Sequence, residues 1–170
     1  MKFYRIEPKD LGEYVWLKPR KPHLWKVVEK PFKEDKETPR ISVAPSLLHC
    51  LSALTGNPIY FGSGYLYQLV SDAKIVFPKD KVPDCILTHE HWVLEPALFK
   101  RIAPFVIHGS LGLKKARNWK ELEQIIEEVL SAKVLFKDGI IHVFDEYTWM
   151  FRDLILSLPI GHHTYQGMER

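Results

Sequence analysis

Two histidines and two glutamates fall within the segment Thr88–Pro96, which leads directly into the mostly apolar segment Ala97–Ile107. Charge placed at the start of a core strand costs desolvation energy unless it is exposed, paired or used in chemistry. We therefore look for a functional site here first. Glu90 is the carboxylate candidate, and His89 or His91 could act as an acid or base, since histidine titrates near neutral pH.

The same segment does not predict a metal site. His89 and His91 alternate, so on a strand both rings would face one side. A third ligand is missing, because Glu95 lies past the expected turn and Leu94 stands where a zinc-binding HExxH helix needs its second histidine. The pair His162-His163 falls in the tail, where we prefer a frayed end to a metal site.

Two earlier segments carry side chains that could meet Glu90. The first, Lys2–Glu7, is predicted to be a strand that Pro8 ends. The second is a strand around Ser42, and it runs into a leucine-rich helix that Pro45-Ser46 opens and Gly56 stops. A helix N-terminus with free backbone N–H groups suits phosphate, which makes Ser46 a candidate for ligand binding.

The composition of the chain indicates what kind of fold must position these residues. The chain has 170 residues, of which 46% are hydrophobic and 12% aromatic, and a net charge of +3. We expect one globular domain over residues 1–170 that could take an anionic ligand. Its two cysteines indicate reduced thiols in a cytoplasmic protein, and neither a signal peptide nor a membrane span is expected.

The order of elements predicts the α+β class with a mixed or antiparallel sheet. A charged, proline-containing loop is expected over Lys18–Arg40, and a helical turn or an extended piece over Asp10–Trp16. The expected strands are Lys2–Glu7, Arg40–Ala44, Tyr65–Val70, Lys74–Phe77, Trp92–Leu94 and Phe99–Ile107. A helix capped by Asn118, a hairpin over 133–144 and a helix over Asp145–Leu158 follow. This divides the chain into a strand-rich, ligand-binding core (1–107) and a helix–hairpin–helix extension (108–170).

Three segments together resemble the ADP-ribosyltransferase-like fold. Phe3-Tyr4-Arg5 is similar to its first-strand Arg pattern, and Ile41–Ser46 is similar to its second-strand Ser pattern. The segment Glu90–Phe99 is similar to the family's segment with the catalytic Glu, most closely as it occurs in poly(ADP-ribose) polymerases. Tyr65-Leu66-Tyr67 is similar to the aromatic strand that lies between the Ser segment and the Glu segment. The resemblance covers roughly residues 1–107 and implies a split β-sheet. The chain departs from the family in having no Gly after Arg5 and a looser serine segment.

The resemblance implies an NAD-dependent activity that cleaves the nicotinamide–ribose bond and transfers or releases ADP-ribose. Glu90 would stabilise the oxocarbenium-like state, Arg5 would hold a phosphate or ribose, and Ser42 would order Glu90. Several other side chains are expected to contact the nucleotide: Tyr4, Ser46, Tyr65, Tyr67 and His91, with Tyr60 as a further stacking candidate. The acceptor would be a protein or a nucleic acid.

Two alternatives remain open. One is a non-catalytic module on the same fold that binds a nucleotide or a protein, in the setting of a toxin or of phage defence. The other is a nucleic-acid module, which the interleaved charges of Lys33–Lys36 disfavour. For each residue alone, an ordinary structural role is also open: Arg5 as a surface ion pair, Ser42 as a buried hydroxyl, Glu90 as an edge charge.

Overall fold

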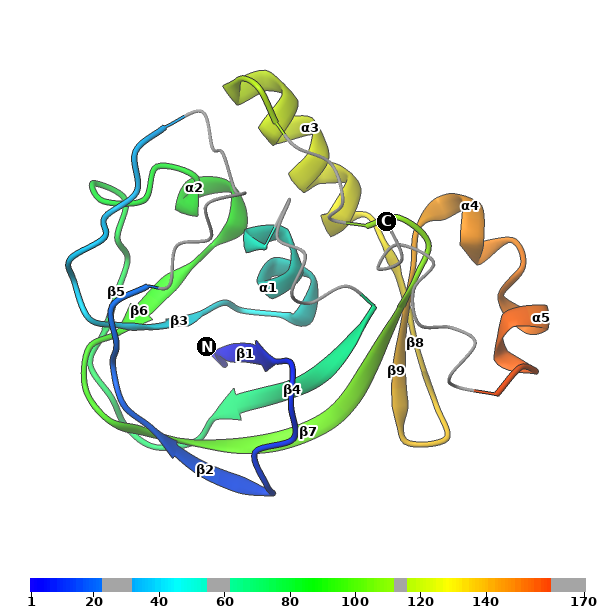
Figure 1. Ribbon diagram of the computed structural model, residues 1–170, viewed down its shortest axis with the longest axis horizontal. Helices are drawn as coiled ribbons and strands as arrows, with labels where there is room; N and C mark the ends of the chain where they lie inside the picture. Colours follow the sequence, from blue (N-terminus) through cyan, green and yellow to red (C-terminus); the bar gives the residue numbers. More distant parts are fainter. Residues whose placement is uncertain (23–31, 55–61, 112–115, 160–170) are drawn as a thin grey trace.

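The computed structural model describes residues 1–22, 32–54, 62–111 and 116–159, and it is an α+β arrangement of two β-sheets and several short helices (Figure 1). The strands are β1 (Tyr4–Glu7), β2 (Tyr14–Leu17), β3 (Ile41–Val43), β4 (Ser63–Leu69), β5 (Ile75–Val76), β6 (His91–Val93), β7 (Ala97–His108), β8 (Lys133–Lys137) and β9 (Ile140–Phe144). The helices are α1 (Leu47–Ala53), α2 (Cys85–Thr88), α3 (Trp119–Leu130), α4 (Glu146–Trp149) and α5 (Arg152–Leu156). The predicted α+β class and mixed sheet are therefore confirmed.

The larger sheet is built around β7. Its strand order is β1-β4-β7-β9-β8, and β2 also pairs with β7. All of these pairs are antiparallel except β7 with β9, which run parallel. The smaller sheet has the order β3-β6-β5, with antiparallel pairs. The segment Asp10–Trp16 thus supplies a strand, and the short α2 was not anticipated.

Two clusters of buried side chains hold the layers together. One joins β3 and β6 of the small sheet to β4 and β7 of the large one, and its members include Ile41, Val43, Tyr67 and Phe99. The other lies between α1 and the large sheet and includes Phe105. Alternating apolar residues on each strand explain why these faces are buried, because successive side chains point to opposite sides.

Helix α3 begins as predicted. The side chain of Asn118 accepts a hydrogen bond from the Glu121 backbone N–H at 2.9 Å, and four apolar residues of the helix are buried. Trp119, expected on the packing face, is 36% exposed. The hairpin of β8 and β9 turns at Asp138-Gly139, where both residues have positive φ.

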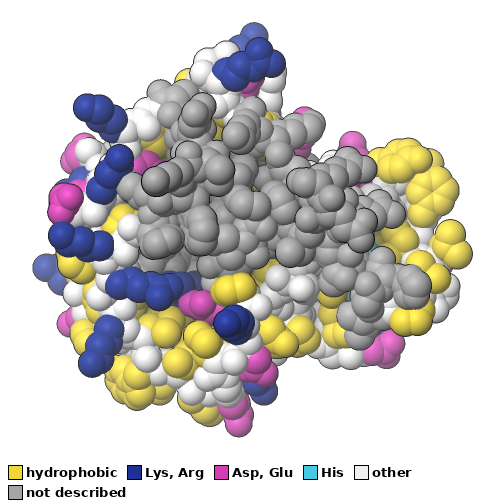
Figure 2. Space-filling view, in the orientation of Figure 1, with side chains coloured by type: hydrophobic (Ala, Val, Ile, Leu, Met, Phe, Trp, Pro, Cys, Tyr) yellow, Lys and Arg dark blue, Asp and Glu magenta, His cyan; other side chains and the backbone are white. Residues whose placement is uncertain are grey.

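The single helix expected over Asp145–Leu158 is wrong. The chain forms α4 and α5 instead, and the break lies at Met150-Phe151. The apolar side chains of this segment are largely exposed, with Tyr147 at 74% and Leu154 at 65%, and Figure 2 shows hydrophobic side chains over this end of the molecule. Because most helices are stabilised by packing an apolar face, this segment lacks the contacts that would favour one longer helix.

Among the helices of the described residues, none has both the length and the apolar character needed to cross a bilayer. The predicted stop at Gly56, the stacking candidate Tyr60 and the pair His162-His163 lie outside the described residues.

Candidate functional site

The candidate site lies where the two sheets meet. An isolated antiparallel bridge joins Tyr4 to Ala44, and their backbone groups exchange hydrogen bonds of 2.7 and 2.8 Å. Arg5 follows Tyr4 on β1, and Ser42 lies on β3 two residues before Ala44. The bridge therefore fixes the distance between the two strands that carry these polar side chains.

Ser42 and Glu90 are in direct contact. The Ser42 hydroxyl donates to Oε1 of Glu90 at 2.8 Å. The register explains the contact, because Ser42 lies opposite Trp92 and Glu90 precedes Trp92 by two residues, which places all three on one face. The indole Nε1–H of Trp92 donates to the same Oε1 at 2.9 Å. Glu90 is 9% exposed, so this carboxylate is buried and held by two donors.

Arg5 is held by a neighbour on its own strand. Its Nε and Nη2 both lie 2.6 Å from Oε1 of Glu7, and the side chains are 13% and 9% exposed. Its Nη1 donates to the backbone carbonyl of Ser42 at 3.4 Å. The guanidinium is thus oriented and largely neutralised within the protein, with its Nη1 side facing β3.

These residues line one small cavity of about 100 Å³. Its walls are Arg5, Ile6, Ser42, Val43, Ala44, Cys50, Ala53, Leu54 and Glu90. Burial raises the pKa of the Cys50 thiol to about 12, so this sulfur is uncharged at neutral pH and is not an activated nucleophile. The chemistry available in the cavity is that of a fixed carboxylate, a hydroxyl and a guanidinium.

The tyrosines expected to contact a nucleotide do not line this cavity. Tyr67 is fully buried, and its hydroxyl bonds to the loop before β2, donating to the Gly12 carbonyl at 2.9 Å. Tyr65 packs with the cluster between the sheets, and Tyr4 packs against the cluster beneath α1. The Tyr67 ring thus belongs to the core, and its contact with a ligand stays a prediction.

Ser46 and the histidines also have structural partners. Ser46 caps α1, accepting from the His49 backbone N–H at 3.2 Å and lying 2.7 Å from Nδ1 of the same residue. Burial, and then the neighbouring His89, lower the pKa of His49. The ring of His91 packs against Phe3 and Phe77, with centroids 4.8 and 5.0 Å away. Ser46 and His91 thus lie outside the walls of the cavity.

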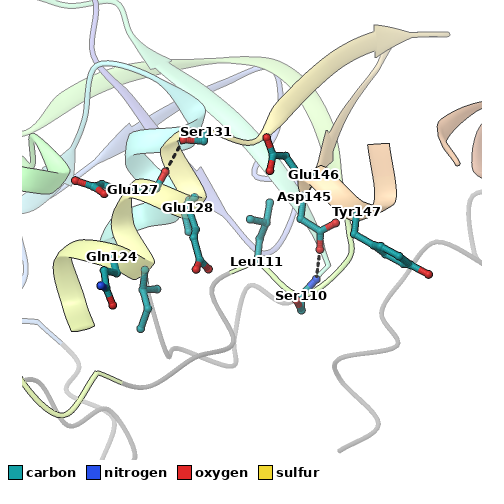
Figure 3. A pocket seen from close by; sticks show the side chains of 11 residues that line it. Ser110, Leu111, Gln124, Glu127, Glu128, Ser131, Asp145, Glu146 and Tyr147 are labelled. Carbon is teal, nitrogen blue, oxygen red and sulfur yellow. Dashed lines mark hydrogen bonds between the residues drawn. The ribbon is translucent and has the colours of Figure 1, made fainter. Parts of the chain in front are cut away.

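A much larger hollow lies elsewhere, between α3 and the start of α4 (Figure 3). Its volume is about 710 Å³, and four carboxylates line it: Glu127, Glu128, Asp145 and Glu146. None of the site residues predicted from the sequence lies there. Four negative charges disfavour a phosphate or pyrophosphate, so the smaller cavity remains the candidate for an anionic ligand.

Three residues of the site were missed by sequence reasoning. Glu7 could have been found, because Arg5-x-Glu7 on a strand places both side chains on one face. Trp92 could have been found in the same way from Glu90-x-Trp92. Arg40 carries no such signal, since its guanidinium reaches the Trp92 ring only through the pairing of β3 with β6.

Within the described parts of the chain, no group of three or more His, Cys, Asp or Glu side chains is arranged to hold a metal ion. Comparison of the chain with protein-family models, with curated proteins and with solved structures found no match.

Proposed function

We propose that this protein binds NAD as a substrate and cleaves its nicotinamide–ribose bond, with an ADP-ribosyltransferase-like fold and activity. The observation that carries the proposal is the meeting of Arg5, Ser42 and Glu90, which come from three distant segments, around one cavity at the junction of two sheets. The separation into a larger and a smaller sheet supports the same fold. The ADP-ribose would pass to water or to a protein or nucleic-acid acceptor.

In this proposal the carboxylate of Glu90 stabilises positive charge that develops on the ribose as nicotinamide leaves. The Ser42 hydroxyl holds the carboxylate, so little reorganisation is needed when the charge appears. Arg5 directs its Nη1 side towards β3, where it would donate to a phosphate or a ribose hydroxyl.

Nicotinamide release from NAD, followed by chromatography, tests the proposal. The Glu90→Gln variant keeps the size of the side chain and removes its charge, and we expect its rate to fall about 100-fold or more. Glu95→Gln is the matched control, because it makes the same change at an exposed residue of the same segment and an amide oxygen can still accept from the Lys74 N–H. A Glu90→Gln protein that stays folded and active would overturn the role of Glu90.

A second candidate is a non-catalytic binder of a nucleotide or part of one. The size of the cavity favours it, since about 100 Å³ is well below the roughly 300 Å³ at which ligand pockets usually begin. Calorimetry with NAD and ADP-ribose separates the two candidates: binding without release of nicotinamide would support the binder.

A further inference from the structure

Trp92 contacts the carboxylate of Glu90, and Arg40 contacts the ring of Trp92. Trp92 is 1% exposed, and its Nε1–H donates to Oε1 of Glu90, the same oxygen that the Ser42 hydroxyl contacts. Among the described residues, no donor contacts Oε2. Two donors on one oxygen restrict rotation of the carboxylate and leave the other oxygen for a ligand hydroxyl or a developing charge.

Arg40 supports the indole from its other side. Its guanidinium carbon lies 4.1 Å from the centroid of the Trp92 ring, and the residue is 7% exposed. Its Nη1 donates to the carbonyls of Asp35 and Thr38 at 3.1 and 3.3 Å, which fix the orientation of the group. Its Nη1 also lies 3.5 Å from Oδ1 of Asp35, and its Nε has no hydrogen-bond partner in the described part of the chain.

The charge of Arg40 acts on Glu90 as well as on the indole. Burial lowers the pKa of Arg40, and the Glu90 carboxylate opposes this more strongly than Asp35 or Glu34 does. The two opposite charges attract each other, so Arg40 also helps to hold Glu90 in place. A guanidinium over an indole face also polarises the ring and strengthens its N–H as a donor.

We propose that Trp92 and Arg40 are positioning residues for Glu90: Trp92 fixes one carboxylate oxygen, and Arg40 holds the indole in the orientation from which it donates. The inference rests on the proposed function for its kinetic consequence, but the arrangement can be measured without it. Neither side chain lines the cavity, so each acts through Glu90 and not on a ligand directly.

Trp92→Phe tests the proposal because it keeps an aromatic ring for Arg40 and removes the Nε1–H. We expect kcat for nicotinamide release to fall about 10- to 100-fold, with KM changed less than about 3-fold. In carboxyl-¹³C spectra at pH 7, assigned with Glu90→Gln, the resonance of the Glu90 carboxyl should shift in Trp92→Phe, since the donor to its Oε1 is lost. Arg40→Met should also shift this resonance, because the indole loses the guanidinium that packs on it.

Trp16→Phe is the matched control, because Trp16 is 64% exposed and lies on β2 of the larger sheet, whereas Glu90 precedes β6 of the smaller sheet. A further measurement needs no tryptophan variant: in Glu90→Gln, the indole N–H resonance of Trp92 should shift while that of Trp16 stays. The positioning role is overturned if kcat for nicotinamide release is the same in Trp92→Phe and Trp16→Phe. It is also overturned if the indole N–H resonance of Trp92 does not shift in Glu90→Gln. A wild-type protein that cleaves no NAD but shows both spectroscopic effects would refute the proposed activity and leave the positioning intact.

Discussion

The ion pair between Arg5 and Glu7 gives the sharpest stability prediction. Two guanidinium nitrogens lie 2.6 Å from one carboxylate oxygen, and the side chains are 13% and 9% exposed. Removing one partner of a fully buried pair costs about 3–5 kcal/mol, because the other charge is left unpaired. Glu7→Gln keeps an acceptor oxygen and the site retains some exposure, so we expect a loss of about 2–3 kcal/mol in the free energy of unfolding.

Urea unfolding followed by circular dichroism measures this loss. For a chain of this length, each kcal/mol also lowers Tm by about 2–4 °C, so a fall of roughly 4–12 °C should accompany it. The matched control is Glu37→Gln, which makes the same change in an ion pair with Lys21 whose side chains are 63% and 83% exposed. Such a surface pair contributes at most about 1 kcal/mol.

A double-mutant cycle completes the test. Arg5→Met removes the other charge, so the Arg5→Met/Glu7→Gln protein has no unpaired charge at this site. Its loss in the free energy of unfolding should therefore be smaller than the sum of the losses in the two single variants. We expect a coupling of at least about 1 kcal/mol. Strictly additive losses, or a Glu7→Gln loss no larger than that of Glu37→Gln, would refute the argument that burial makes this pair important.

Two further predictions concern titratable groups. Burial raises the pKa of Cys50 to about 12, and burial together with nearby carboxylates raises that of Cys85 to about 11. Neither thiol should therefore react quickly with a disulfide reagent at pH 8 until urea unfolds the protein. Two thiols that react quickly in the native state would contradict this. Burial tends to raise the pKa of Asp145, but hydrogen bonds from Thr148 and from the Ser110 backbone N–H outweigh it and hold that pKa below its ordinary value. The stabilisation therefore exists above about pH 4 and is lost as pH falls further. Asp145→Ala, which removes this N-cap, should cost about 1 kcal/mol at pH 7 and less at pH 3, as followed by thermal unfolding; an equal cost at both pH values would argue against the capping carboxylate.

Local signals in the sequence predicted much of the fold. Alternating apolar residues, the cap at Asn118 and the turn at Asp138-Gly139 each depend on neighbours in the chain, and the elements they mark are present. The helix α2 was missed because four residues are too few to show a period. The break at Met150-Phe151 was missed because no proline or glycine marks it.

The candidate site could be predicted only in part. The three side chains that meet at the cavity could be proposed from separate segments, and their partners Glu7 and Trp92 could have been found from the alternation of side chains along a strand. Tyr67 illustrates the limit: an aromatic residue in a strand suits a ligand surface and a core equally well, and only the packing of the sheets places its ring inside. The sequence similarly predicts Arg40 as the end of a charged loop. The pairing of β3 with β6 instead buries its guanidinium over the Trp92 ring.

The central place of β7 has a consequence for how the chain can be divided. At Phe105 and Val106 one edge of β7 pairs with β4. Over Phe105–His108 its other edge pairs in parallel with β9, which follows α3 in the chain. A fragment ending near residue 110 would keep every wall of the small cavity but leave this edge unpaired, with Phe105 and Ile107 beside it. Unpaired apolar edges recruit strands from other molecules, so such a fragment should aggregate during expression. The strand-rich half that carries the cavity and the half that follows it are therefore expected to fold as one cooperative unit.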